Sequence, residues 1–214
     1  MKLTEFVKKY KAYPVIDSST FALLGEKLQT LRCEVRYWLK HGHLIQLKRG
    51  VYVLSEDLRK GPLSVGFISN FLLSPSYVSL EYALGHYDLI PEKVTVYTSI
   101  TTKKTTSYET PIGSFDYHSV KEGLFCGFTR GISDGESYFI AYPEKALLDF
   151  FYFHQDLKGT ESEFEESYRF QNLEILNLGR FDELRAKYNK KTNSIARSFI
   201  KFCRQEKKRY KVFK

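Results

Sequence analysis

The chain of 214 residues contains little cysteine: only Cys33, Cys126 and Cys203, which are widely scattered. No pair of them has the short spacing of a metal-binding or redox motif. Long apolar runs are also missing, since nothing approaches the ~18 consecutive apolar residues of a membrane span. The first ten residues lack the apolar stretch of a secretory signal. These absences favour a cytoplasmic protein that does not contact a membrane.

Recognisable catalytic motifs are missing as well. The sequence has no glycine-rich phosphate loop and no HExxH pair. Its histidines form no ligand spacing beyond His41-Gly42-His43, which falls at the predicted end of a helix, where a histidine favours the dipole. Asp116 and His118 share one face of a predicted strand, but no nucleophile can be assigned to them. We therefore expect no enzyme activity, no bound metal and no cofactor.

Charge is abundant and unevenly distributed along the chain. Residues 1–55 carry ten Lys/Arg and four Asp/Glu, residues 56–179 carry ten and eighteen, and residues 180–214 carry thirteen and three. Basic ends favour a polyanionic partner, most simply DNA or RNA. The acidic middle does not suit a DNA surface, and it either faces a basic protein or only keeps the chain soluble.

Residues 1–55 predict three short helices followed by a hairpin. The helices are expected over Thr4–Lys11, Thr20–Leu24 and Lys27–His41, from their apolar spacing and from the stop signals of Gly25 and Gly42. Two β-prone runs follow, His43–Leu47 and Val51–Leu54, joined by the three-residue loop Lys48-Arg49-Gly50. This order is typical of a winged helix-turn-helix, in which the hairpin is the wing.

The third predicted helix carries a polar face opposite its apolar stripe. Arg and Gln side chains make bidentate contacts to base edges in the major groove, and early helix positions lie deepest there. We therefore predict base contacts for Gln29, Thr30 and Arg32, with Arg36 shared between bases and phosphates and Tyr37 at the edge. Phosphate contacts are predicted for Lys40, Lys48 and Arg49. The alternative is an ordinary solvated helix face.

Residues 62–214 predict a second, larger domain, with its boundary at Gly61-Pro62. Helices are expected over Leu63–Leu73, over Leu80–His86 with Ser79 as cap, and over Pro143–His154. Strands are expected at Tyr77-Val78, Val94–Ile100, Thr105–Glu109, Ser114–Val120, Phe125–Thr129 and Ser137–Ala141. The whole chain thus predicts an α+β fold with a mixed, mostly antiparallel sheet and a C-terminal helical segment.

The last predicted helix, Ile195–Lys208, has a basic stripe along one side. Lys201, Arg204 and Lys208 on this stripe are candidates for additional phosphate contacts. The alternative is that the basic helix docks on the acidic middle of the chain.

Three further segments stand in a fixed order along the chain. They are Leu39-Lys40-His41-Gly42-His43-Leu44 with Leu47-Lys48-Arg49-Gly50-Val51-Tyr52, then Tyr77-Val78-Ser79-Leu80-Glu81-Tyr82-Ala83-Leu84, then Tyr142-Pro143-Glu144-Lys145-Ala146-Leu147-Leu148-Asp149. Together they resemble the winged-helix head and two downstream segments of the AbiEi antitoxins, which belong to abortive-infection, type IV toxin–antitoxin systems. The resemblance spans residues ~15–153.

The resemblance implies two functions in phage defence. The head would repress its own operon by binding inverted repeats in the promoter. The second domain would counteract a cognate toxin that resembles nucleotidyltransferases, by direct contact or indirectly. The sequence specifies neither the operator, nor the toxin, nor whether a homodimer forms on DNA.

Alternative interpretations stay open. Pro143, Glu144, Lys145 and Asp149 invite a catalytic interpretation, but Pro at a helix start and Glu in its first turn favour helix initiation, which is the reading we prefer. One alternative for the protein is a winged-helix regulator whose second domain senses a ligand or dimerises. The other is a DNA-binding enzyme, such as a nuclease or a modifier of the toxin.

Overall fold

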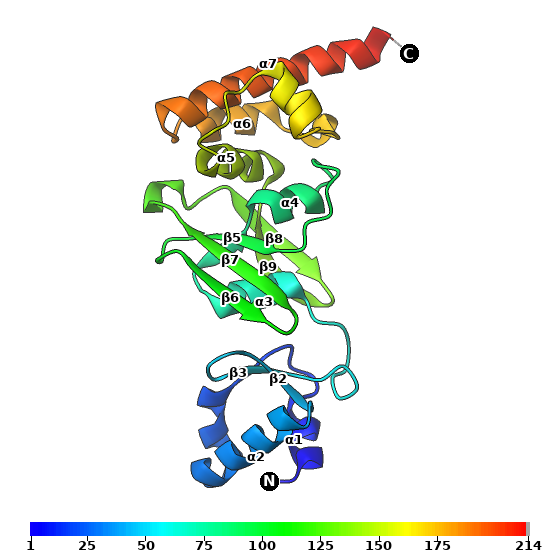
Figure 1. Ribbon diagram of the computed structural model, residues 1–214, viewed down its shortest axis with the longest axis vertical. Helices are drawn as coiled ribbons and strands as arrows, with labels where there is room; N and C mark the ends of the chain where they lie inside the picture. The colour runs from blue at the N-terminus through cyan, green and yellow to red at the C-terminus, as the bar shows by residue number, and fades with distance from the viewer. Residues whose placement is uncertain (213–214) are drawn as a thin grey trace.

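The structure is a computed structural model that describes residues 1–212, with side chains described for residues 1–207. The molecule is elongated (Figure 1). Residues 1–55, here called the head, lie at one end of its long axis, and the C-terminal helices lie at the other. The body, residues 62–212, contains a six-stranded sheet between these ends. Within the described range, no helix is long and apolar enough to cross a membrane.

The head contains three helical segments and a small sheet. The helices are α1 (Leu3–Tyr10), the 3₁₀ helix η1 (Ser18–Leu24) and α2 (Leu28–Lys40). The strands are β1 (Ile16–Asp17), β2 (Leu44–Lys48) and β3 (Val51–Leu54), which pair antiparallel in the order β1-β3-β2. The predicted helices and the predicted pair of strands are therefore confirmed.

Local chemistry explains where these helices begin and end. Asp17 precedes η1, and its Oδ1 accepts a hydrogen bond from the backbone N–H of Ser19 at 2.8 Å. Gly25 and Gly42 follow η1 and α2 with φ of 72° and 73°, the left-handed conformation that closes a helix. The apolar side of α2 packs against α1 and η1 in the core of the head, through Leu31, Val35, Trp38, Phe6 and Phe21.

The hairpin turn differs from the prediction. Lys48 pairs with Val51, so the connection is the two-residue turn Arg49-Gly50 and not a three-residue loop. An irregularity of register between Gln46 and Lys48 draws Lys48 back into the strand. Gly50 has φ of 81°, and a Cβ there would come within 2.7 Å of Ser18 Oγ, so this turn requires glycine.

The six strands of the body form one mixed sheet in the order β6-β7-β5-β4-β9-β8. Pairs β4–β9 and β5–β7 are parallel, and the other neighbours are antiparallel. The expected α+β fold with a mixed, mostly antiparallel sheet is confirmed. The strands are β4 (Ser76–Val78), β5 (Tyr97–Thr101), β6 (Thr106–Thr110), β7 (Gly113–Ser119), β8 (Phe128–Ser133) and β9 (Glu136–Ala141).

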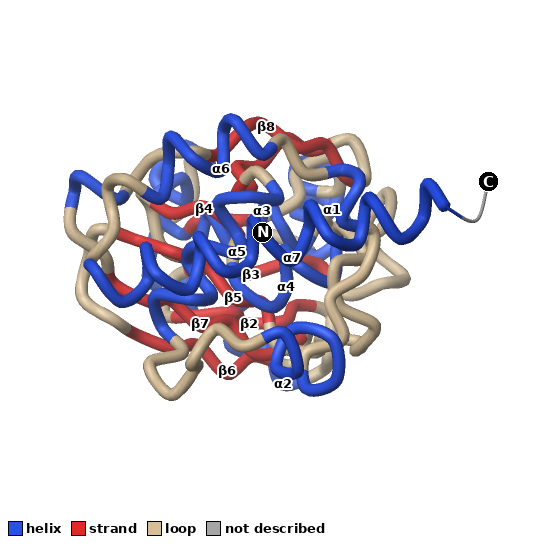
Figure 2. Tube along the Cα trace, turned by 90° about the horizontal axis from the view of Figure 1, so that it is seen from above, coloured by secondary structure: helices blue, strands red, loops and turns tan. Residues whose placement is uncertain are grey.

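Helices cover this sheet on the sides of the head and of the C-terminus (Figures 1 and 2). α3 (Val65–Leu72) lies toward the head, whereas α4 (Leu80–His86) and α5 (Pro143–Phe153) lie toward the other end. The outer layer on α5 consists of α6 (Leu178–Arg185) and α7 (Lys190–Val212). Single turns complete the body: η2 (Glu122–Leu124), η3 (Glu163–Ser167) and η4 (Leu173–Ile175).

An apolar cluster joins the head to the body. Leu47 and Val51 of the hairpin pack in one cluster with Ile68 and Leu72 of α3 and with residues of β7. The connecting segment is also held in place, since the N–H of Lys60 donates to the carbonyl of Lys11 at 3.2 Å. The predicted boundary at Gly61-Pro62 therefore separates two units that share part of a core.

Candidate nucleic-acid interface

A groove of about 620 Å³ crosses the head between η1, α2 and the hairpin turn. Phe21 of η1 and Val35 of α2, both buried, contribute to its floor. Its polar lining comes from all three elements: Ser18 and Ser19 from η1, Arg32 and Arg36 from α2, and Gln46 and Arg49 from the hairpin. The fold thus brings residues far apart in the sequence to one concave surface.

The apolar side of α2 decides which of its residues face outward. All six predicted contact residues of this helix are exposed: Gln29, Thr30, Arg32, Arg36, Tyr37 and Lys40. Arg32 and Arg36 line the groove, because residues four apart lie on one face, ~6 Å apart along the axis. Tyr37 lies outside the groove lining, with its ring centroid 4.0 Å from that of His41.

The cations of this surface have no carboxylate partner in the described part of the chain. None of the ion pairs found there includes Arg32, Arg36, Lys40 or Arg49. The contacts of the Arg36 guanidinium are local, to the carbonyl of Arg32 at 3.4 Å and to Cys33 Sγ at 3.6 Å. These cations therefore keep most of their donors for an external anion.

The hairpin turn is fixed relative to η1. The N–H of Ser18 donates to the carbonyl of Gly50 at 2.8 Å, and Asp17 pairs with Val51 in the sheet. Arg49 therefore sits on a short, constrained turn at one side of the groove, opposite the arginines of α2.

Lys48 is not at the tip of the hairpin, where the sequence placed it. Its Nζ donates to the carbonyl of Leu72 at 2.5 Å and lies 5.6 Å from the centroid of the Tyr108 ring. Burial is the main reason that the pKa of Lys48 is lowered, with Asp17 acting against this shift and Lys103 adding to it. We therefore assign Lys48 to the contact between head and body, and Arg49 alone remains as the cation of the turn.

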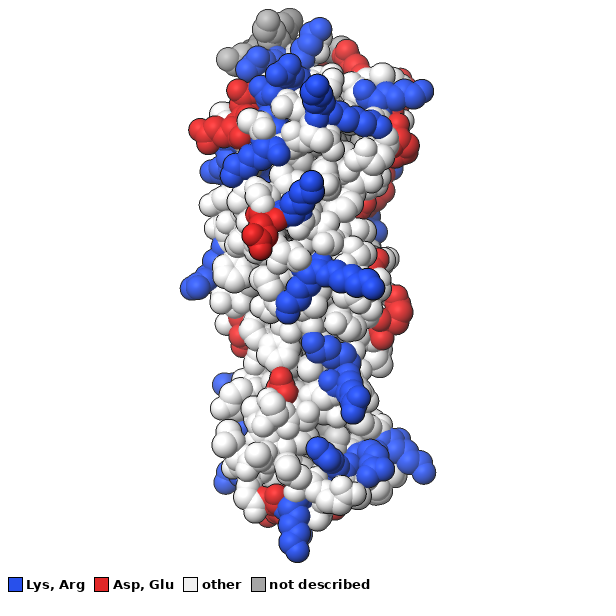
Figure 3. Space-filling view, turned by 90° about the vertical axis from the view of Figure 1, so that its left-hand side faces the viewer, with Lys and Arg blue, Asp and Glu red and all other residues white. Residues whose placement is uncertain are grey.

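The predicted contacts of the C-terminal helix do not join the groove. Lys201 and Arg204 are exposed on α7, at the opposite end of the long axis from α2 (Figure 1). The side chain of Lys208 lies outside the described residues. In Figure 3, Lys and Arg side chains gather over the α7 end of the molecule as well as around the head.

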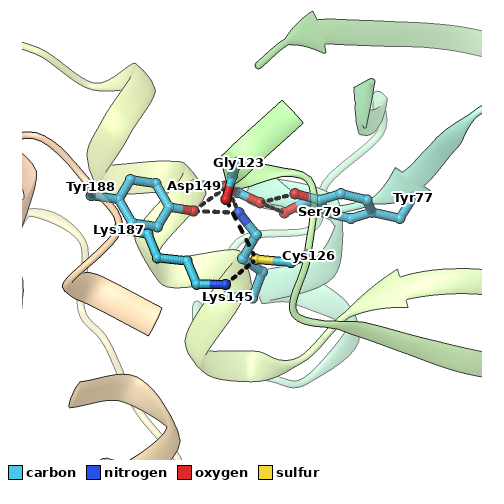
Figure 4. A network of polar contacts seen from close by, with 8 residues as sticks. All are labelled: Tyr77, Ser79, Gly123, Cys126, Lys145, Asp149, Lys187 and Tyr188. Carbon is cyan, nitrogen blue, oxygen red and sulfur yellow. Dashed lines mark hydrogen bonds and ion pairs between the residues drawn. The ribbon is translucent and has the colours of Figure 1, made fainter. Parts of the chain in front are cut away.

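Two of the three segments singled out in the sequence meet in a buried polar network of the body (Figure 4). Asp149 of α5 accepts four hydrogen bonds there. The donors are Lys145 Nζ at 2.6 Å, Tyr188 Oη at 2.6 Å, Ser79 Oγ at 2.8 Å and Tyr77 Oη at 3.0 Å. Ser79 lies at the N-cap position of α4, as predicted, but its side chain does not cap the helix, because its hydroxyl donates to Asp149.

The groups of this network are closed off from solvent and satisfied. Lys145 and Asp149 are both 0% exposed, and Lys145 Nζ also contacts Tyr188 Oη. Burial and the neighbouring Asp149 raise the pKa of Tyr77 and of Tyr188 well above the usual range. Glu144 is also engaged, since its Oε1 accepts from the N–H of Asn177 at 2.6 Å. These contacts fit the expected structural role of the segment.

Asp116 and His118 line a second hollow, of about 530 Å³, on the body. Glu81 and His154 also line it. His154 Nδ1 faces the carbonyl of Phe150 at 2.9 Å, and its Nε2 faces Glu81 Oε1 at 3.3 Å. Among the described residues, no three His, Cys, Asp or Glu side chains lie close enough to hold a metal ion.

Sequence reasoning missed part of the groove. Ser18, Ser19 and Gln46 were not among the predicted contact residues. The contact of Gly50 with Ser18 brings the hairpin turn beside η1 and so adds these side chains to the groove. Alternation along β2 was the one available signal for Gln46, because it predicts an outward side chain between Ile45 and Leu47.

No known protein family matches the chain, and no curated protein matches it either. Any functional assignment therefore depends on the residues and geometry described above, together with the resemblance carried by the three sequence segments.

Proposed function

We propose that this protein is a DNA-binding antitoxin that also represses its own operon, and that its head is a winged helix-turn-helix. The observation that carries DNA binding is the groove between α2 and the hairpin, lined by Arg32, Arg36 and Arg49 without a carboxylate partner. In this proposal η1 and α2 are the helix-turn-helix pair, and the β2–β3 hairpin is the wing.

The proposed docking places α2 in the major groove of duplex DNA. Gln29, Thr30 and Arg32 lie in its first turns, which enter deepest and read base edges. Arg36 lies one turn after Arg32 and reaches either a base or a phosphate. The phosphate backbone then runs along the groove of the head toward Arg49.

Phosphate contacts supply most of the affinity in this arrangement. Arg49 holds the backbone from the hairpin side, and Lys40 holds it at the last turn of α2, where Tyr37 borders the contact. Ser18 and Ser19 add hydroxyl donors from η1. The excess of six positive charges over residues 1–55 attracts DNA from a distance and makes binding sensitive to salt.

The antitoxin role is assigned to the body, and the resemblance to AbiEi antitoxins supports it. The partner would be a nucleotidyltransferase-like toxin encoded beside this gene, counteracted directly or indirectly. Inverted repeats in the promoter would recruit two copies of the head. A ligand-sensing regulator is the second candidate, and the hollow lined by Asp116 and His118 favours it.

Arginine substitutions in the groove test the DNA-binding proposal. Arg32→Ala should weaken binding to a duplex from the protein's own promoter by about 1–3 kcal/mol, because a base contact is lost. Arg49→Ala should weaken promoter and unrelated duplexes alike and reduce the salt slope by about 0.9. Fluorescence anisotropy at fixed salt measures both effects, and Arg130→Ala, on exposed β8, is the matched control.

Unchanged affinity in both groove variants would rule out this interface. For the antitoxin role, co-expression with the neighbouring toxin gene should relieve growth arrest. Relief that depends on an added small molecule would favour the ligand-sensing regulator instead. Relief that persists in the Arg32→Ala variant would separate the antitoxin role from DNA binding.

A further inference from the structure

The basic side of α7 has no role in the DNA-binding interface proposed for the head. This helix has 23 residues, and its basic side lies at the far end of the molecule from the proposed DNA-binding groove (Figures 1 and 3). Figure 2 shows its last turns extending beyond the rest of the body.

The core fixes which side of α7 faces outward. Ile195, Phe199 and Phe202 are buried among residues of the body's core, including Phe151 and Phe164. At 3.6 residues per turn, an arc of roughly 60° on the opposite side holds four exposed cations: Lys190, Arg197, Lys201 and Arg204. The orientation of this basic face is therefore set by apolar packing and not by its charges.

The charges of the basic face are not neutralised by ion pairs in the described part of the chain. None of its four cations takes part in an ion pair found there. Glu206, the single carboxylate among residues 190–207, lies on the other side of the helix by its spacing. Glu161, in the acidic middle of the chain, lines a small hollow together with Lys201, so the basic face borders the acidic middle there.

We propose that this face of α7 binds the phosphate backbone of a second nucleic-acid duplex. From Lys190 to Arg204 the helix rises ~21 Å, and the same length of duplex presents roughly twelve phosphates. Cations at this spacing follow a backbone without reading bases. The protein then holds one duplex at each end of its long axis.

Other polyanions fit this face less well. A membrane surface requires a free apolar side that can enter the lipid, and the apolar side of α7 is already buried in the core. Unpaired nucleic acid favours aromatic side chains on which bases stack. Beside the cations, along one edge of this face, the exposed described residues are Ser194, Ser198 and Gln205, none of which is aromatic.

The first experiment separates nucleic-acid binding by α7 from binding by the head. In full-length protein carrying Arg32→Ala, Arg36→Ala and Arg49→Ala, binding to an unrelated duplex should persist, weakly and with strong salt dependence. Adding Arg197→Gln, Lys201→Gln and Arg204→Gln should reduce the slope of log K against log[salt] by about 2 to 3. The matched control, Lys104→Gln, Lys121→Gln and Arg130→Gln, removes three exposed cations elsewhere on the body and should leave the slope unchanged.

The second experiment measures bridging, and it alone depends on the proposed function of the head. Wild-type protein on an immobilised promoter duplex should capture a second, labelled duplex, and the α7 triple variant should lose this capture while still binding the promoter. An unchanged salt slope in the α7 variant would overturn the proposal. So would an α7 variant that binds duplex normally but no longer binds the toxin, because the face would then be a protein interface. Circular dichroism confirms that each variant is folded.

Discussion

The head and the body use positive charge in opposite ways. In the head, Arg32, Arg36 and Arg49 are exposed around a groove and lack carboxylate partners in the described chain. In the body, Lys145 is completely buried against Asp149 at 2.6 Å. A positively charged side chain therefore stays available to an external anion in the head, whereas in the body it is paired inside the core.

Lys48 belongs to the head in sequence, but its ammonium group is used inside the protein, as that of Lys145 is. It follows the basic pattern of the head in sequence, yet its ammonium is taken by the carbonyl of Leu72. A basic residue in a segment that is proposed to bind DNA is thus not by itself a DNA contact, because a neighbouring backbone oxygen can accept its hydrogen bond instead.

The largest expected effect is on the buried pair. Asp149→Ala leaves Lys145 charged and unpaired in the core, and should lower the free energy of unfolding by about 3–5 kcal/mol. Urea denaturation followed by circular dichroism measures this loss. The double variant Lys145→Met and Asp149→Leu should recover only part of it. No unpaired charge is left, but the hydroxyls of Tyr77, Ser79 and Tyr188 lose their acceptor. A loss below about 1 kcal/mol in Asp149→Ala would contradict the structural role of the pair.

A smaller effect is expected at the contact between head and body. Lys48→Met removes the donor to the Leu72 carbonyl and should lower the free energy of unfolding by about 1–3 kcal/mol. Lys40→Met is the matched control, and it should change stability by less than about 0.5 kcal/mol because its ammonium is exposed. For binding to an unrelated duplex the order should reverse, with Lys40→Met the more damaging. Equal stability of the two variants would contradict this assignment.

The smallest effect is a change in pH dependence. The pKa of Tyr188 is raised in the folded state, so this state keeps a proton that the unfolded chain releases above pH ~10. Stability from this group is therefore present at neutral pH and is lost as pH rises beyond ~10. Tyr188→Phe should reduce the alkaline loss by up to about 1.4 kcal/mol per pH unit. Urea denaturation between about pH 9 and about pH 11 measures the slope of the unfolding free energy against pH. An unchanged slope in the variant would show that groups other than Tyr188 cause the alkaline loss.

Elements with strong local signals could be predicted from the sequence. α2 follows from the apolar spacing of Leu31, Val35 and Trp38 and from Gly42, and the exposed side of α2 follows from the same spacing. The arginines of the groove that belong to α2 were found for this reason.

Contacts between distant segments could not be predicted in the same way. Asp149 meets Tyr77, 72 positions away, and Tyr188, 39 positions away, and no local pattern encodes such pairs. Lys48 was misplaced because a register irregularity in β2 depends on how the two strands pair, which the composition of the turn does not reveal. The position of α7 relative to the head likewise depends on the whole sheet between them.

Because the hairpin and α3 share an apolar cluster, the head depends on the body to bury part of its surface. Cutting the chain at Gly61-Pro62 would expose Leu47 and Val51, which the body now covers. The head could therefore not be fused to another protein without also changing these apolar residues. In such a chain, new binding specificity is more easily gained by changing residues on the surface of α2 than by exchanging whole domains.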